Sequence, residues 1–246
     1  ALQLVCGDLV IESDESFKTA ESPITFDDYR YGEHYDARLQ LDGWNKPGFD
    51  DSKWGNALTA PTPRGEVRTC EAEPITVVKE LKPISIKKLE NGYLYDFGYN
   101  CAGVCRLTVK GKKGQRIEMQ HGEMLIDGKL DIRNIWFPNN EKGVHWQFDK
   151  NNVHKDIYIC RGDECEIYTP SFTYHGFQYV MVTGITEEQA TSQLLTYLVM
   201  NSDLKPCGGF STTNKTVAAL YEATVRSDLA NFYYFPTDCP QREKNG

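Results

Sequence analysis

The feature that most constrains this fold is a long stretch, residues 75–198, in which bulky hydrophobic side chains recur at every second position. The alternation is clearest in four runs: Tyr93–Phe97, Leu107–Val109, Ile117–His121 and Phe177–Met181. Successive side chains of a β-strand point to opposite faces, so a period of two predicts strands with one buried face. Turn-forming clusters such as 111–114 separate the runs. Many short strands punctuated in this way predict an antiparallel β-sandwich with little helix.

The hydrophobic period changes near the C-terminus. Residues 202–209 predict a linker, and Asn214 is placed to cap a helix that follows it. Helical spacing then relates Val217, Leu220, Tyr221, Thr224, Val225 and Leu229. Plain core packing is the simplest explanation of this stripe, although a single helix cannot bury its own stripe. The predicted fold class is therefore mainly β, an antiparallel β-sandwich with a short α-helical C-terminal segment.

A second linker is predicted over residues 61–74, where three prolines and Gly65 interrupt any periodic pattern. The sequence thus divides into one unit over residues 1–60 and a β-sandwich over residues 75–201. In the first unit, Trp44, Phe49 and Trp54 lie in a loop-rich stretch. Aromatic side chains can stack on sugar rings, but anchoring the loop onto a sheet is the favoured interpretation.

The charge of the chain argues against nucleic acid as a partner. Its 246 residues carry a formal net charge of -8, whereas phosphate binding needs a basic face. No run approaches the roughly 20 apolar residues that span a bilayer, and residues 1–11 lack the charged flank and cleavage site of a signal peptide. We expect no nucleic acid and no membrane as partner, whereas a neutral sugar is compatible. The compartment is left open, with the cytoplasm favoured over secretion, and so is a homo-oligomer.

Eight cysteines are too few for a disulfide scaffold in a chain of this length. Cys101 and Cys105 form C-x3-C, and Cys160 and Cys165 form C-x4-C, without histidines at zinc-finger spacing. We expect buried, reduced thiols, no metal and no cofactor. A bridge between Cys160 and Cys165 is left open for an oxidising compartment.

Two histidines invite a catalytic interpretation. His121 and Glu123 share one face of a predicted strand, which would suit an acid–base pair or part of a metal site. Without a third ligand in view, a buried hydrogen-bonded pair is the simpler interpretation. We expect His175, at the start of a strand, to be structural.

The densest chemistry lies in residues 231–246, where the aromatic run Phe232–Phe235 precedes Asp238, Arg242 and Glu243. Aromatic side chains of this kind can form an apolar wall with polar tips. A carboxyl group beside such a wall can have a raised pKa and serve as a proton donor. This arrangement makes the two acids candidate site residues.

A structural alternative is open at the same residues. Asp238 can cap a helix, with Pro240 in its first turn and Gln241 closing a capping box. Arg242 and Glu243 would then lie on a solvated face. Spacing alone favours this alternative.

The phrase P-T-D-C-P-Q-R-E-K-N-G, residues 236–246, resembles the start of the catalytic domain in bacterial α-L-rhamnosidases of glycoside hydrolase family 78. Other phrases follow the order of that family: G-E-H-Y-D-A-R at 32–38, P-G-F-D-D-S-K-W at 47–54, Y-D-F-G-Y-N at 95–100, H-G-E-M-L-I-D-G at 121–128 and P-S-F-T-Y-H-G-F-Q-Y-V at 170–180. The resemblance covers nearly the whole chain. Several phrases in the right order are much more specific than any one of them.

The resemblance implies a domain order. Residues 1–60 are expected to be the C-terminal part of an N-terminal β-domain, 61–74 the linker and 75–201 a β-sandwich domain. Residues 207–246 are expected to hold the first helix and active-site approach of a truncated (α/α)6 catalytic domain. In the family the last phrase continues with W-T-G-D, and this chain ends one residue before that tryptophan.

The resemblance also implies roles. Glu243 matches the general acid of the family, and Asp238 and Arg242 match residues that bind the rhamnose. Many members have R-D-E where this chain has R-E, which leaves Glu243 as the single candidate here.

The function implied is inverting hydrolysis of terminal α-L-rhamnosides, with a rhamnose-containing glycoside or polysaccharide as partner. Inversion needs a second carboxylate that activates water, and the family places it downstream of residue 246. We therefore expect this fragment to be inactive by itself. Two noncatalytic alternatives are a carbohydrate-binding module that uses the region of Trp44 and a scaffold on which the barrel docks.

Overall fold

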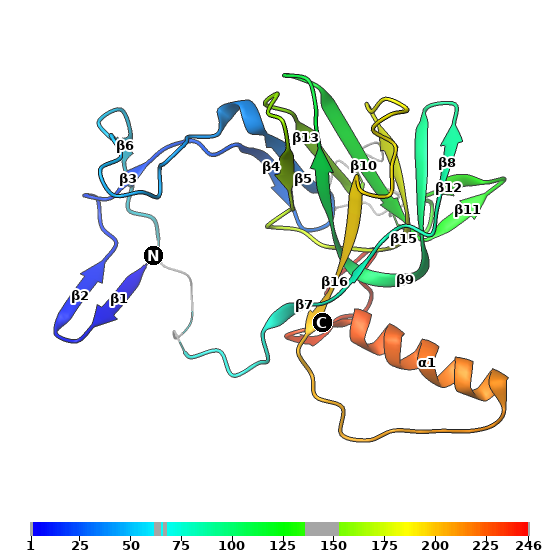
Figure 1. Cartoon of the computed structure of the whole chain (residues 1–246). Coiled ribbons are helices and arrows are strands. Elements are labelled where there is room, and N and C mark those ends of the chain that lie inside the picture. The colour runs from blue at the N-terminus through cyan, green and yellow to red at the C-terminus, as the bar shows by residue number, and fades with distance from the viewer. Residues whose placement is uncertain (1, 62–64, 66–67, 136–152, 246) are drawn as a thin grey trace, which may run out of the picture. The chain divides into compact units, whose positions relative to one another are not determined.

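The computed structural model describes residues 2–61, 65, 68–135 and 153–245, and the chain forms two compact units (Figure 1). The smaller unit combines residues 1–23 with 39–70, and the larger unit combines 24–38 with 71–246. Residues 24–38, which the sequence groups with the first unit, therefore fold with the larger one. Part of the linker predicted over 61–74 lies outside the described residues.

The smaller unit contains two pairs of short strands. β1 (Gln3–Cys6) and β2 (Leu9–Glu12) form an antiparallel hairpin, and β3 (Lys18–Thr19) pairs with β6 (Gly55–Asn56). The hairpin turn contains Gly7 at φ +59°, a left-handed conformation that glycine adopts without steric cost.

The larger unit is built around one continuous set of hydrogen-bonded strands, in the order β4-β5-β13-β10-β15-β9-β16-β7, with β8 and β14 also paired to β9. Their bounds are β4 (Ile24–Asp28), β5 (Gly32–Asp36), β7 (Ile75–Leu81), β8 (Ser85–Leu89), β9 (Gly92–Val109), β10 (Arg116–Gly122), β13 (Lys155–Ile159), β14 (Glu166–Tyr168), β15 (His175–Thr183) and β16 (Leu195–Ser202). A short 3-10 helix, η1 (Ala37–Leu39), follows β5. This strand content confirms the mainly β fold class that the period of two predicts.

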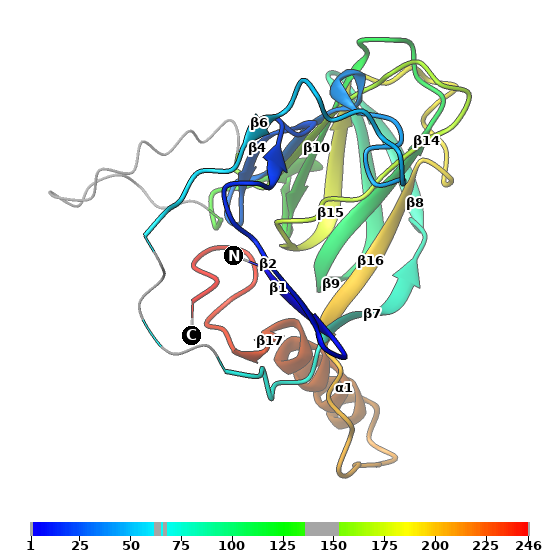
Figure 2. The same cartoon turned by 90° about the vertical axis from the view of Figure 1, so that its left-hand side faces the viewer.

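Strand β9 belongs to two layers of strands. Its first half, Tyr93–Asp96, pairs with β15 on one side and with β8 on the other. Its second half, Gly103–Val109, pairs with β16 and β14. Figure 2 shows β9 and β16 side by side, with β7 beyond β16. Aromatic rings join the layers, because Phe177 of β15 stacks on Tyr197 of β16 with ring centroids 3.9 Å apart.

The core between the layers consists of the alternating hydrophobic residues of the sequence pattern. Tyr95, Leu107, Ile117 and Phe177 are fully buried. One strand pair departs from the predicted antiparallel arrangement, because β5 pairs with β13 in parallel. Strands adjacent in a sheet but far apart in the chain need no hairpin between them, so a sequence pattern does not fix their direction.

Glycine at position 103 is required by the close approach of β9 and β16. Its φ is +152°, and a Cβ atom built there would lie 2.0 Å from the carbonyl oxygen of Leu198. Any other residue would therefore force the two strands apart.

The helix α1 (Lys215–Ala230) begins where the sequence predicts. The Asn214 side chain accepts hydrogen bonds from the backbone N–H groups of Thr216 and Val217. None of its residues is buried, and Leu220 is 65% exposed. The described residues cover the apolar stripe only in part, because Val217 and Leu220 are exposed whereas Tyr221 and Leu229 are half-buried. No helix in the described part of the chain is both long and apolar enough to cross a membrane.

Two small hairpins complete the larger unit: β11 (Met124–Ile126) with β12 (Lys129–Asp131), and β17 (Phe232–Tyr233) with β18 (Phe235–Pro236). All eight cysteines are free thiols, and Cys101, Cys105 and Cys160 are buried as expected. The expectation of buried thiols is wrong for Cys6, Cys70, Cys165 and Cys207, which are exposed. The bridge between Cys160 and Cys165 is therefore not formed.

We expect Gly103→Ala to lower the free energy of unfolding of the larger unit by about 2 kcal/mol or more, because the new Cβ meets the backbone of β16. Gly208→Ala is the control, because nothing lies within 4 Å of a Cβ at that position, and its effect should stay within about 0.5 kcal/mol. Urea denaturation of both variants measures the difference. Equal stability of the two variants would contradict the close approach of β9 and β16.

Candidate functional site

The candidate site residues lie on one turn, residues 237–245, which we call the acid loop. It follows β18, and its two ends pair with each other: the Asp238 N–H donates to the Asn245 carbonyl at 2.7 Å, and the Asp238 carboxylate accepts from the Asn245 N–H at 3.0 Å. The Lys244 N–H donates to the Cys239 carbonyl at 3.2 Å. The sequence therefore folds here into a closed loop.

The helix-cap interpretation of Asp238 is wrong. No helix begins at Pro240, and residues 240–243 form a turn. The Asp238 carboxylate accepts a hydrogen bond from the far end of the loop instead of from the N–H groups of a first helical turn. Lys244 has φ +55°, a left-handed conformation that interrupts helical geometry.

Glu243 is held as a carboxylate by its neighbours. Arg242 donates from Nε to both carboxylate oxygens at 2.8 Å, and the Cys239 thiol donates to one of them at 2.8 Å. Burial acts to raise the pKa of Glu243, but the hydrogen bonds from Arg242 and Cys239 outweigh it and hold this pKa below its ordinary value. The raised pKa that the sequence suggests for a carboxyl beside an aromatic wall is therefore wrong for this arrangement.

The aromatic run does not form a wall at the carboxylate. Tyr233 is buried and stacks on Tyr174, with ring centroids 4.1 Å apart, while Tyr234 and Phe235 are exposed. Tyr234 has φ +64°, so the backbone reverses within the run. The strand-like alternation of buried and exposed side chains therefore stops at Tyr234. The sequence alone does not show this reversal of the backbone.

The acid loop brings two of the predicted acids together. Ligand atoms of Asp238, Cys239 and Glu243 all lie within 4.8 Å of one another, a grouping that could hold a metal ion. Burial raises the pKa of the Cys239 thiol, as does its hydrogen bond to Glu243, and a protonated thiol is a poor metal ligand. The expected absence of a metal stays a prediction.

The acid loop packs on the end of β15 through Pro240. A Cβ atom at Gly176 would lie 2.7 Å from Cγ of Pro240. Arg30 donates from Nε to the Glu243 carbonyl at 3.2 Å, and the Lys244 side chain is buried. Sequence reasoning missed Arg30, Gly176 and Lys244, because no local spacing relates residues that meet only in the folded chain.

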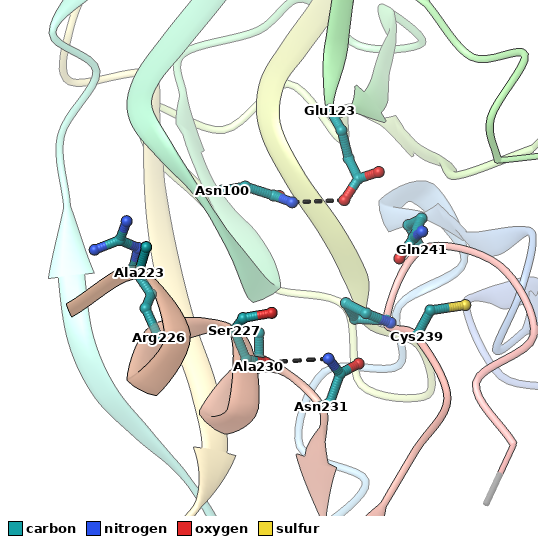
Figure 3. A pocket seen from close by; sticks show the side chains of 10 residues that line it. Asn100, Glu123, Ala223, Arg226, Ser227, Ala230, Asn231, Cys239 and Gln241 are labelled. Atoms are coloured by element: carbon teal, nitrogen blue, oxygen red, sulfur yellow. Dashed lines mark hydrogen bonds between the residues drawn. The ribbon is translucent and has the colours of Figure 1, made fainter. Parts of the chain in front are cut away.

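A cavity of about 380 Å³ lies between α1 and the acid loop (Figure 3). Arg226 and Ser227 line it from α1, and Cys239 and Gln241 line it from the acid loop. The Glu123 carboxylate at its edge accepts from the amide groups of two asparagines, Asn100 and Asn134, at 2.5 and 2.7 Å. Burial raises the pKa of Glu123, and these hydrogen bonds act in the opposite direction.

His121 and Glu123 do not form the predicted pair. Nδ1 of His121 lies 3.0 Å from the His154 carbonyl oxygen, whereas Glu123 follows the end of β10 and binds the two asparagines. The strand ends between them, so the two side chains no longer share one face.

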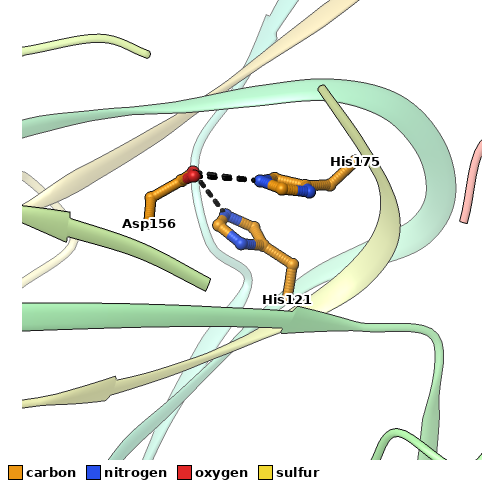
Figure 4. A group of neighbouring side chains, drawn as sticks. All are labelled: His121, Asp156 and His175. Atoms are coloured by element: carbon orange, nitrogen blue, oxygen red, sulfur yellow. Dashed lines mark hydrogen bonds and ion pairs between the residues drawn. The ribbon is translucent and has the colours of Figure 1, made fainter. Parts of the chain in front are cut away.

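A buried group of His121, His175 and Asp156 lies inside the sandwich (Figure 4). Nε2 of His175 is 3.1 Å from both carboxylate oxygens of Asp156, and Nε2 of His121 is 3.8 Å from one of them. Burial lowers the pKa of both imidazoles, that of His121 to about 3. Their spacing could hold a metal ion. His175 is fully buried, and the structural role expected for it stays a prediction.

Aromatic residues of the smaller unit take different environments. Trp44 is 60% exposed, while Phe49 and Trp54 pack edge to face with ring centroids 5.6 Å apart. Sugar binding by this region stays a prediction.

Family comparisons divide the chain into three consecutive matches. Residues 7–79 match the alpha-L-rhamnosidase N-terminal domain, 86–201 the bacterial alpha-L-rhamnosidase concanavalin-like domain, and 205–246 the bacterial alpha-L-rhamnosidase 6 hairpin glycosidase domain. The chain belongs to the bacterial α-L-rhamnosidase family. The acid loop lies in the third match, that to the 6 hairpin glycosidase domain.

Individual relatives of this chain agree with the family matches. An alpha-L-rhamnosidase of Formosa agariphila is 33% identical over 95% of the chain and 24% of its own length. The structure of alpha-L-rhamnosidase from Dictyoglumus thermophilum has a TM-score of 0.85 and 33% identity, covering 96% of the chain and 25% of that protein. A Streptomyces avermitilis alpha-L-rhamnosidase complexed with L-rhamnose has a TM-score of 0.85 and 29% identity, covering 95% and 22%. The chain thus spans about a quarter of the relatives it matches.

Acidification should destabilise the larger unit through its buried imidazoles. Burial lowers the pKa of His121, His154 and His175 below the ordinary 6.5. Below about pH 6.5 the unfolded chain therefore binds more protons, and each such histidine removes up to about 1.4 kcal/mol of unfolding free energy per pH unit. Asp156 acts in the opposite direction at the lowest pH values, because burial raises its pKa and the folded state then binds a proton more readily than the unfolded chain.

Urea denaturation at several pH values between about 8 and about 5 measures this loss. The variant His154→Asn should reduce the pH slope, and asparagine tolerates the left-handed φ of +50° at this position. A stability that does not change over this range would contradict the neutral, buried state of the three imidazoles.

Proposed function

We propose that the protein to which this chain belongs hydrolyses terminal α-L-rhamnosides, with Glu243 as general acid and with Asp238 and Arg242 binding the sugar. The observation that carries this proposal is the acid loop, which places the Asp238 and Glu243 carboxylates within 4.8 Å of each other beside Arg242. Membership of the bacterial α-L-rhamnosidase family supports the choice of substrate. A relative crystallised with L-rhamnose supports it further.

The general acid must carry a proton when the glycosidic oxygen leaves. In this structure the hydrogen bonds from Arg242 and Cys239 keep the pKa of Glu243 below its ordinary value. We infer that a sugar hydroxyl takes Arg242 away from this carboxylate. With that hydrogen bond gone, burial acts with less opposition and raises the pKa of Glu243 toward the value that a proton donor needs.

Inversion requires a second carboxylate on the opposite face of the sugar, about 6.5–9.5 Å from the acid. Asp238 lies too close to Glu243 for this role, since their oxygens are within 4.8 Å. We infer that Asp238 binds sugar hydroxyls and that the base is supplied by a part of the longer protein outside residues 1–246. The sandwich and α1 would then support the half of the site that contains the general acid, Glu243.

The 246-residue chain alone should show no turnover of an aryl α-L-rhamnoside, because one carboxylate without its partner cannot stabilise the oxocarbenium-like transition state. The control is the same protein extended to the length of its relatives, which should release the aryl group. Spectrophotometric assay of both proteins at equal concentration measures the difference. Turnover by the 246-residue chain at the rate of the longer protein would contradict the need for a second carboxylate outside it.

In the full-length protein, Glu243→Gln should slow hydrolysis of rhamnosides with basic leaving groups by roughly 10²- to 10⁴-fold, because such leaving groups need a proton. Activated aryl rhamnosides should be slowed much less. Asp238→Asn should raise KM and lower kcat together, because a carboxylate bound to sugar hydroxyls serves the ground state and the transition state. Steady-state kinetics on both substrate types tests the two variants.

The two variants also control for each other, because both change a carboxylate to an amide on the same loop. If Glu243→Gln slowed activated and unactivated rhamnosides equally, Glu243 would be a recognition residue and the assignment of the acid would be wrong.

A further inference from the structure

We propose that Lys244 is a positioning residue for Glu243, because it fixes the acid loop to the end of the sandwich and so sets where the neighbouring carboxylate lies. This inference rests on the proposed function of Glu243. It adds the sandwich to the parts of the protein that determine catalysis.

The Lys244 ammonium is bound inside the protein. The residue is only 6% exposed, whereas lysines are almost never buried without partners. Its Nζ donates hydrogen bonds to the backbone carbonyl oxygens of Tyr29 and Tyr174 and lies 4.7 Å from the centroid of the Tyr174 ring. One side chain thus joins the acid loop to the segment after β4 and to the segment before β15.

The partners of Lys244 are themselves held in place. The Tyr174 ring stacks on Tyr233, and the Tyr233 hydroxyl donates to the Met200 carbonyl at 2.9 Å. Met200 lies in β16. The anchor is therefore connected to the strands of the core rather than to mobile surface groups.

Burial lowers the pKa of Lys244 to about 7, while the carboxylates of Asp156 and Asp28 act in the opposite direction. The ammonium and the neutral amine both carry N–H donors. The bonds to the two carbonyl oxygens therefore remain available on either side of neutral pH.

The anchor acts on Glu243 through the backbone. Lys244 follows Glu243 directly and donates its own N–H to the Cys239 carbonyl at 3.2 Å. Arg30 binds the Glu243 carbonyl, and Pro240 rests on Gly176. Without the Lys244 side chain the loop keeps these contacts but loses the two hydrogen bonds of its buried amine. A shift of about 1 Å at a reacting group can cost about 10²-fold in rate.

The first experiment uses this chain and needs no activity. In Lys244→Met, hydrogen exchange at the Asp238 and Asn245 amides should become at least about tenfold faster, while the amides of β10 keep their protection. The control is Lys79→Met. Lys79 also donates a hydrogen bond to a tyrosine, Tyr99, at 2.8 Å, and its Nζ lies 5.4 Å from the centroid of that ring, but Lys79 is exposed. That variant should leave the acid loop unchanged.

The second experiment uses the full-length protein. Lys244→Met should lower kcat by about 10²-fold on rhamnosides with basic leaving groups and much less on activated aryl rhamnosides. Lys244→Arg should recover most of this rate, because a guanidinium can donate to both carbonyl oxygens. A merely structural role of Lys244 would slow both substrate types equally.

Unchanged exchange at Asp238 and Asn245 in Lys244→Met would overturn the anchor. If exchange became faster but kcat fell equally on both substrate types, the proposal that Lys244 positions Glu243 would be overturned. If Lys244→Met does not fold, Lys244→Gln replaces it, because its side chain ends one atom short of the Nζ that binds the carbonyl oxygens of Tyr29 and Tyr174, and unchanged exchange there also counts against the proposal. A full-length wild type that hydrolyses no rhamnoside would refute the proposed function, whereas the exchange measurement would still decide whether Lys244 anchors the loop.

Discussion

The larger unit depends on β9, because this strand is hydrogen-bonded in both layers of the sandwich. Its first half continues the layer of β15, and its second half begins the layer of β16. The two layers are therefore joined covalently as well as by their core. Glycine at position 103 makes this possible, since the backbone of β16 passes where a side chain would lie.

The same construction supports the candidate site. β15 begins at His175, where its backbone passes beside the acid loop and where Tyr174 receives the Lys244 side chain. The acid loop is thus seated on strands whose positions are fixed by the core rather than on α1. We interpret the sandwich as the rigid base of the acid side, which fits the requirement that catalytic groups be held within a fraction of an ångström.

Much of the fold could be predicted from the sequence. The period of two located the strands because burial of one face requires it, and Asn214 marked the helix start because its side chain satisfies free N–H groups. The parallel pairing of β5 with β13 could not be predicted, since it joins residues more than a hundred positions apart. Neither could the partners of Glu123, which come from β9 and from the segment after β12.

The sequence named the candidate site residues but did not predict the electrostatics of the loop that carries them. The sequence named Asp238, Arg242 and Glu243, and the structure places them on one loop. It could not show that Arg242 binds Glu243 directly and lowers its pKa, because an arginine next to a glutamate in the chain often points elsewhere. The burial of Lys244 was equally hidden, since lysine in a polar phrase normally indicates a solvated side chain.

The contact between Gly176 and Pro240 has an evolutionary consequence. Neither residue contributes a reactive group, yet a side chain at position 176 would occupy the space of the proline ring. A side chain at position 176 is therefore tolerated only when position 240 carries a smaller residue than proline. Aligned relatives should therefore show these two positions varying together, although one lies in the sandwich and the other in the glycosidase segment.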